Sequence, residues 1–156
     1  MLSGLAEIAE VGRDHRRGGY SRHLWQAADL ELRSWFVERA ERLGLQVETD
    51  RNGNLWAWWG QPGPDAVVTG SHLDSVPGGG AYDGPLGVVS SLEAIGRLQA
   101  SGFVPTRPCA VLMFAEMLVR GYTAVASAWY FRGSSCAATR YIRSRQIQKS
   151  PPSAWV

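Results

Sequence analysis

The stretch from Thr69 to Val89, TGSHLDSVPGGGAYDGPLGVV, joins two apolar segments through a polar loop rich in glycine. The residues leading into it, AVVTGS, are apolar and β-branched, which predicts a buried strand ending at Ser71. The residues from Gly84 to Gly102 are largely apolar and predict a buried helix. A strand followed directly by a loop and a helix is typical of α/β folds, so this stretch indicates the fold class.

The flanking sequence predicts further strands and another helix. Residues 28–45 are expected to form an amphipathic helix that stops at Gly44, because apolar residues recur there at roughly helical spacing. These apolar residues are Leu30, Phe36, Ala40 and Leu43. Strands are expected at residues 45–50, 55–59 and 108–115, with a hairpin turn at 51–54. The alternation predicts an α/β sheet with helices on its faces.

Composition limits the class of protein. The chain has 156 residues, 45% apolar and 19% charged, which is typical of one globular domain with its own core. The net charge of +2 is too small to favour nucleic acid or an acidic membrane surface as a partner. Cys109 and Cys136 form no metal-binding spacing and no disulfide framework. With no signal-type or membrane-spanning apolar run, the sequence predicts a cytoplasmic protein.

Three polar residues near the Gly-rich loop are candidates for a metal site. His72 and Asp74 follow the predicted strand, and Asp83 precedes the predicted helix. Ligand sites in open α/β sheets lie outside the carboxyl ends of strands. Imidazole and carboxylate groups bind divalent ions such as zinc or manganese, and Asp74 is well placed to accept the second ring N–H of His72. Asp83 could bridge two ions.

Other interpretations of these residues stay open from spacing alone. A single histidine at a strand end is most often an ordinary hydrogen-bonded residue, and Asp-Gly is usually a turn. The segment GGGAYDG could also cradle a phosphate, but it lacks the Lys-Ser/Thr pair of a P-loop and the spacing of a dinucleotide-binding loop.

The segment GSHLDSVPGGGAYDGPLGVV resembles the amidase branch of the M20 metallohydrolases. This branch comprises N-carbamoyl-L-amino-acid hydrolases, allantoate amidohydrolases and β-ureidopropionases. The segments RRGGYSRHLW, WFVERAERLGLQVETDRNGNLWAWWG and AVLMFAE are similar to the same family, in the same order. The resemblance covers residues 1–116. It implies a partial three-layer α/β/α zinc-peptidase-like catalytic domain, truncated and without the family's dimerisation (lid) domain.

The resemblance also implies roles for individual residues. His72 would ligate one metal, Asp83 would bridge two divalent ions (zinc or manganese), and Asp74 would orient His72. Glu116 matches the first position of an acidic run that supplies the general base and a further ligand in the family. Met117 and Leu118 stand at the next two positions, and neither side chain can accept a proton from water. We therefore expect at most one weakly bound ion and an inactive chain.

The function implied is that of a metal-dependent amidohydrolase acting on linear C–N bonds of small carbamoyl or ureido compounds, such as N-carbamoyl-L-amino acids or allantoate. The family forms homodimers, but the dimerisation domain is expected to be absent here. The alternative is a non-catalytic α/β fragment that binds a metal or a partner weakly. Residues 117–156 are basic, lack Asp and Glu, and do not resemble the family. They are expected to be a poorly ordered tail that arose by a frameshift.

Overall fold

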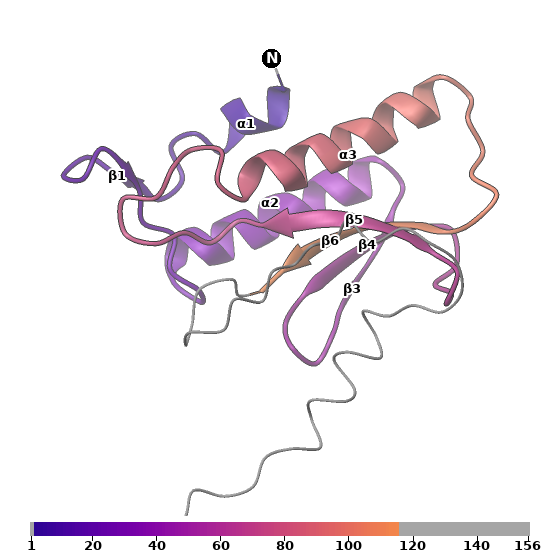
Figure 1. Ribbon diagram of the computed structural model, residues 1–156, viewed down its shortest axis with the longest axis horizontal. Helices are drawn as coiled ribbons and strands as arrows, with labels where there is room; N and C mark the ends of the chain where they lie inside the picture. The colour runs from indigo at the N-terminus through magenta and orange to yellow at the C-terminus, as the bar shows by residue number, and fades with distance from the viewer. Residues whose placement is uncertain (1, 116–156) are drawn as a thin grey trace, which may run out of the picture.

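The computed structural model describes residues 2–115 and shows three helices packed on a mixed sheet (Figure 1). Beside this sheet lies a small two-stranded hairpin near the N-terminus. In chain order the elements are α1 (Ser3–Glu7), β1 (Arg13–Asp14), β2 (Gly19–Tyr20), α2 (Ala27–Arg42), β3 (Gln46–Thr49), β4 (Leu55–Trp59), β5 (Val67–His72), α3 (Pro85–Ala100) and β6 (Cys109–Phe114).

The main sheet has the strand order β3-β4-β6-β5. Strands β3, β4 and β6 pair antiparallel, whereas β5 and β6 pair in parallel through the α3 crossover. Parallel strands need such a crossover because their ends lie at opposite edges of the sheet. The register places His72 of β5 beside Phe114 of β6, so both carboxyl ends lie at one edge.

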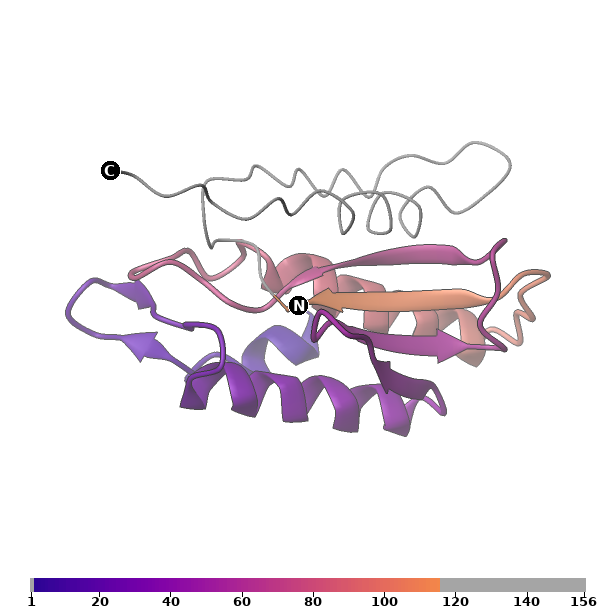
Figure 2. The same cartoon turned by 90° about the horizontal axis from the view of Figure 1, so that it is seen from below.

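The helices lie on one face of the sheet, as Figures 1 and 2 show from two directions. Between the helices and the sheet lies one apolar core, in which α2 contributes Leu32 and Phe36 and α3 contributes Val88 and Leu92, all nearly inaccessible to solvent. Burying each of these side chains stabilises the fold by about 1.5–3 kcal/mol. The expected α/β class is confirmed, and within residues 2–115 the described helices cover one face.

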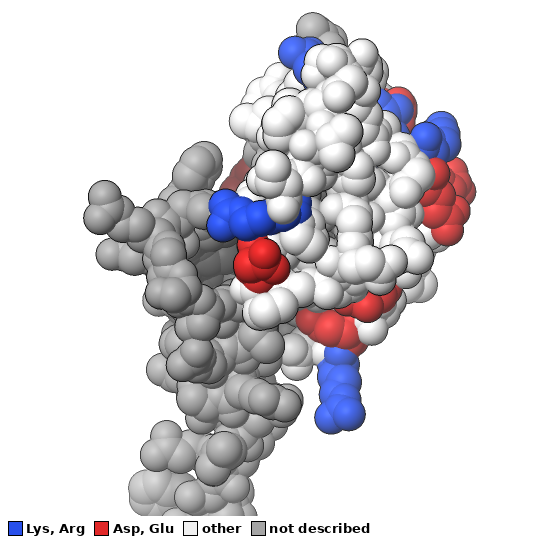
Figure 3. Space-filling model, turned by 90° about the vertical axis from the view of Figure 1, so that its right-hand side faces the viewer, with Lys and Arg blue, Asp and Glu red and all other residues white. Residues whose placement is uncertain are grey.

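The end of the molecule where α3 runs into the loop before β6 carries few charges. Figure 3 looks onto this end, and much of its surface is neither acidic nor basic. Leu98, Phe103 and Val104 are exposed in this part of the chain, with Val104 at 80%. Exposed apolar surface of this kind favours association with other surfaces.

The predicted helices and strands are present, with small errors in their limits and burial. The helix expected at residues 28–45 is α2. The prediction was wrong at Leu30, which was expected on the apolar face of the helix but is 49% exposed. The buried stripe runs through Leu32, Phe36 and Ala40, four residues apart, and Leu30 lies about 200° around the helix from Leu32. Similarly, Leu86 and Leu98 of α3 are exposed, although the sequence predicted a buried helix there.

Two predictions fall outside the described residues: the catalytic role of Glu116 and the tail at 117–156. Among the helices that are described, none has the length and apolar character needed to cross a membrane.

Candidate metal site at the carboxyl end of β5

The candidate site lies where β5 ends, between His72 and the start of α3 at Pro85. Leu73 lies within the core, and this anchors the first residue of the connecting loop. The neighbouring parallel strand β6 ends at the same edge of the sheet. This is the edge at which open α/β sheets bind ligands.

His72 and Asp74 are brought together, and both are only 5% exposed. The ring Nδ1 of His72 lies 3.0 Å from the backbone oxygen of Asp74 and 3.1 Å from its Oδ1. Both of these atoms accept hydrogen bonds, so Nδ1 carries the proton and Nε2 of the neutral ring keeps its lone pair. This is the tautomer that a metal ligand requires, with a carboxylate fixing the ring.

The charges around His72 act on its protonation. Burial by itself lowers the pKa of His72, but the hydrogen bonds and charge of Asp74 and the charge of Asp83 outweigh burial. The pKa is therefore raised above its ordinary value. Asp83 itself is exposed.

Gly84 lets α3 begin directly against His72. Its φ of +92° lies in the region that favours glycine, and a Cβ there would come within 2.6–2.7 Å of the His72 ring and backbone oxygen. Pro85 then starts the helix with a suitable φ and no unused N–H. The Asp-Gly-Pro sequence thus places Gly84, the residue after Asp83, against the histidine.

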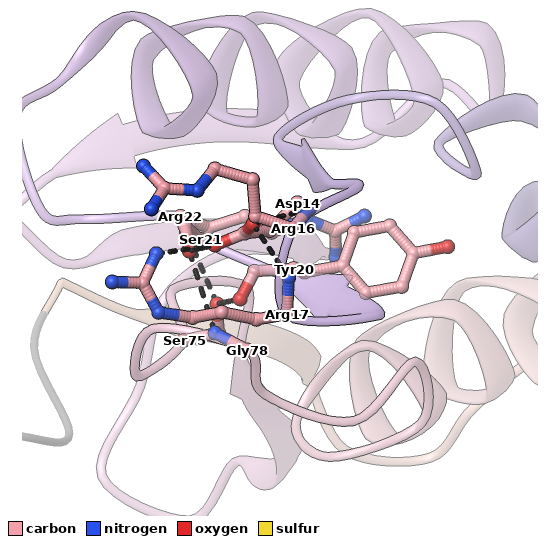
Figure 4. Close-up of polar contacts among 8 residues, drawn as sticks. All are labelled: Asp14, Arg16, Arg17, Tyr20, Ser21, Arg22, Ser75 and Gly78. Atoms are coloured by element: carbon pink, nitrogen blue, oxygen red, sulfur yellow. Dashed lines mark hydrogen bonds and ion pairs between the residues drawn. The ribbon is translucent and has the colours of Figure 1, made fainter.

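The Gly-rich loop is held by the N-terminal hairpin, a role that the sequence did not reveal. Tyr20 and Gly79 exchange two backbone hydrogen bonds of 3.0 and 2.9 Å. Arg22 and Ser75 are joined in both directions: the Ser75 N–H donates to the Arg22 oxygen, and the Arg22 N–H donates to Ser75 Oγ. Arg22 and Ser75 are drawn in Figure 4. The two sets of contacts hold the loop at Ser75 and Gly79, which precede Asp83 by eight and four residues.

The hairpin is closed by Asp14 (Figure 4). Its carboxylate accepts hydrogen bonds from Ser21 Oγ at 2.6 Å and from Arg17 Nη1 at 3.0 Å, as well as from two backbone N–H groups. The Ser21 hydroxyl, followed by Arg17, holds the pKa of Asp14 well below its usual range. The only sequence signal for this region was the resemblance of RRGGYSRHLW to a family segment, which assigned no roles.

The donor set at the site is incomplete among the residues that are described. His72 and Asp74 are in contact, but no three His, Cys, Asp or Glu residues within 2–115 form a cluster that could hold an ion, so the structure does not bring Asp83 into a three-residue donor group. Imidazole and carboxylate donors suit zinc or manganese, so the residues present fit part of such a site.

Comparison with known proteins shows what kind of chain carries this arrangement. Residues 54–117 match the family model described as Peptidase family M28. The chain is 41% identical over 98 residues to a ureidoglycolate hydrolase of Oryza sativa subsp. japonica, covering 62% of this chain and 20% of that protein. It is 36% identical over 114 residues to an N-carbamoyl-L-amino acid amidohydrolase of Geobacillus stearothermophilus, covering 72% of this chain and 28% of that protein.

Solved structures agree with these matches. The crystal structure of AtUAH in complex with glyoxylate superposes with a TM-score of 0.65 at 34% identity, covering 74% of this chain and 28% of that one. The fold and its relatives therefore define an α/β chain that is similar to part of several hydrolases. More specifically, the chain belongs to the M28/M20-like amidohydrolase family, as its motifs predicted. It spans between a fifth and just over a quarter of the length of these curated relatives.

Proposed function

We propose that this chain forms part of a metal-dependent amidohydrolase site that cleaves linear C–N bonds of ureido or carbamoyl compounds. The observation that carries this proposal is the orientation of His72. Its Nδ1 is bonded to Asp74, which leaves Nε2 as the ring atom for a metal. The similarity to ureidoglycolate and N-carbamoyl-amino-acid hydrolases supports the choice of substrate class. Allantoate is a further candidate.

Each residue at the edge of the sheet has a proposed role. His72 and Asp83 would hold the metal, with Asp83 bridging to a second ion, and Asp74 would hold the His72 ring in place. A bound divalent ion polarises a carbonyl oxygen and makes water more acidic. Because His72 and Asp74 are buried, their mutual orientation does not depend on solvent.

Glu116 is proposed as the first acidic residue of the catalytic run. It follows Ala115, whose N–H donates to Asn54 Oδ1 at 2.8 Å. Met117 and Leu118 stand where a base and a ligand are expected, so we propose at most one weakly bound ion and an inactive chain. The cytoplasmic location, the homodimeric family assembly and the frameshifted origin of residues 117–156 stay predictions.

Turnover tests this proposal. The 156-residue chain, loaded with zinc or manganese, is incubated with N-carbamoylglycine, ureidoglycolate or allantoate, and released ammonia is measured. We expect little or no release from this chain, and any release should stop on chelation and in His72→Ala. The matched control is His23→Ala, which removes an exposed histidine and should leave the rate unchanged.

Ammonia release that survives both chelation and loss of His72 would contradict metal dependence. Metal binding that His72→Ala leaves unchanged, without any turnover, would favour the second candidate, a non-catalytic α/β chain that binds a metal or partner weakly. The absence of a three-residue donor group within residues 2–115 is the observation in favour of that second candidate.

A further inference from the structure

The helical side of the molecule carries a small cavity between the end of α2 and the second half of α3. Its volume is about 240 Å³, and α1 closes it on one side at Ser3. Pockets that enclose drug-sized molecules have about 300–1,000 Å³, so this cavity can take only a smaller ligand. Because α3 begins beside His72 and the cavity lies in its second half, the cavity is separate from the candidate metal site.

The floor of this cavity is apolar, and a glycine leaves it open. Leu92 is only 1% exposed, and Leu43 packs against the same core. A Cβ at Gly96 would lie 3.1 Å from Leu43 Cδ2, so a side chain at this position would fill the space that glycine leaves. Gln99 Nε2 donates to the Leu43 oxygen at 2.9 Å, which fixes Leu43 against α3. The shape of the cavity is therefore set by contacts between α3 and the end of α2.

The polar groups of the cavity beside α1 satisfy one another. Arg39 Nη1 pairs with Glu7 Oε1 at 2.8 Å, and Arg39 Nη2 donates to Ser3 Oγ at 3.1 Å. Glu93 Oε1 accepts a hydrogen bond from the Gly4 N–H at 3.3 Å and another from Ser3 Oγ at 3.4 Å. The charge of Arg39 is thus balanced by Glu7, and the Glu93 carboxylate is held toward α1.

Arg97 is the charged residue of the cavity that has no such partner. It follows Glu93 by four residues on α3, a spacing at which glutamate and arginine side chains can pair. Glu93 is instead bonded to Ser3 and Gly4, and Arg97 forms no ion pair or side-chain hydrogen bond with any residue between 2 and 115. Because Arg97 is exposed and lines the cavity, it places an unbalanced positive charge at the rim of an apolar hollow.

We propose that this cavity binds a small monocarboxylate with a short apolar tail, whose carboxylate contacts Arg97 and whose tail covers Leu43 and Leu92. The planar donors of a guanidinium match the two oxygens of a carboxylate. Among the charged residues that line the cavity, Arg39 and Arg97 are positive and Glu93 is negative, so the lining carries a net charge of +1. A monoanion balances this charge, whereas a phosphate dianion would exceed it and meet the Glu93 carboxylate. The site is independent of the proposed function, because it uses none of the residues at the end of β5.

The test titrates the ¹⁵N-labelled full chain with sodium butyrate and follows backbone amide signals by NMR, with sodium chloride at the same ionic strength as the reference. We expect saturable shifts of the Gly96 and Arg97 signals with butyrate and none with chloride. In Arg97→Gln, which removes the charge of an exposed side chain, butyrate should bind at least about tenfold more weakly. The matched control is Arg107→Gln, which changes an exposed arginine in the loop before β6 and should bind butyrate as the wild-type chain does.

Two further probes examine the two parts of the ligand. Butyramide, which has the same tail without the charge, should bind more weakly than butyrate, and inorganic phosphate, which has no tail, should cause no saturable shift. The proposal is overturned if butyrate causes no saturable shift, if butyramide or phosphate binds as well as butyrate, or if Arg97→Gln binds butyrate as tightly as Arg107→Gln does. Because no arm uses a metal ion, either result leaves the test of His72 unaffected.

Discussion

At the scale of single residues, the chemistry of this site depends on how His72 is enclosed. Asp74 accepts the hydrogen bond of Nδ1, and Gly84 borders the ring on the side of α3. The charge of Asp83, in the loop, helps to raise the pKa of the ring. None of these neighbours would tolerate a larger or differently charged group without changing the ring. Small substitutions there should therefore have large effects.

Gly84→Ala should destabilise the fold by about 2–4 kcal/mol, because it combines an unfavourable positive φ with a clash against His72. Urea unfolding of the full chain measures the change. Gly102→Ala is the matched control, since Gly102 also has a positive φ, +76°, but nothing lies within 4 Å of the added methyl group. It should lose only about 1 kcal/mol. Equal losses in the two variants would show that the contact with His72 has no energetic weight.

At the scale of elements, the loop between β5 and α3 is positioned by a hairpin more than fifty residues away in sequence. Strand β2 pairs with the loop through Tyr20 and Gly79. The Ser21 hydroxyl donates to Asp14 within the hairpin and accepts a hydrogen bond from the Gly78 N–H of the loop. A Gly-rich loop is flexible in isolation, so these contacts reduce the conformations available to it. The hairpin is thus part of the site without contributing a ligand.

The hairpin should make stability depend on pH through Asp14. Because the native state lowers the pKa of Asp14, its contribution is present above the ordinary carboxyl pKa and is lost as pH falls through and below about 4. Asp14→Asn should therefore lower the free energy of unfolding at pH 7 and change it much less at pH 2. Urea unfolding at both values measures this difference.

The control for that experiment is Asp65→Asn, which alters an exposed carboxylate in the loop before β5 and should leave the free energy of unfolding nearly unchanged at pH 7. If Asp14→Asn were as harmless as this control at pH 7, the hairpin network would have no stabilising role.

At the scale of the whole molecule, the sequence predicted the sheet and its two long helices because their apolar runs are long enough to show a period. The predicted buried face of α2 was wrong at Leu30, because spacing does not reveal which apolar residues face the sheet. Helix α1 and the β1–β2 hairpin were missed because elements of two to five residues carry no period. The contact between His72 and Asp74 was predicted because the two residues lie close in sequence, and their roles at a metal site stay predictions.

The burial of Arg33 was not predicted from the sequence, because it depends on contacts that no local pattern records. Gly53, Trp25 and Ala115 come from three separate segments and meet only in the folded chain. When a helix is predicted from the spacing of its apolar residues, an arginine is assigned to the solvent face. Long-range packing, rather than propensity, determines that this one is buried.

The central claim is that His72 and Asp83 are metal ligands at the carboxyl end of β5. Isothermal titration of the dialysed full chain with zinc measures it most directly, comparing the wild-type chain with His72→Ala, Asp83→Asn and the control His23→Ala. We predict one weak site in the wild-type chain and in His23→Ala, with binding weakened at least about tenfold in the other two variants. Unchanged zinc affinity in both His72→Ala and Asp83→Asn would contradict the account.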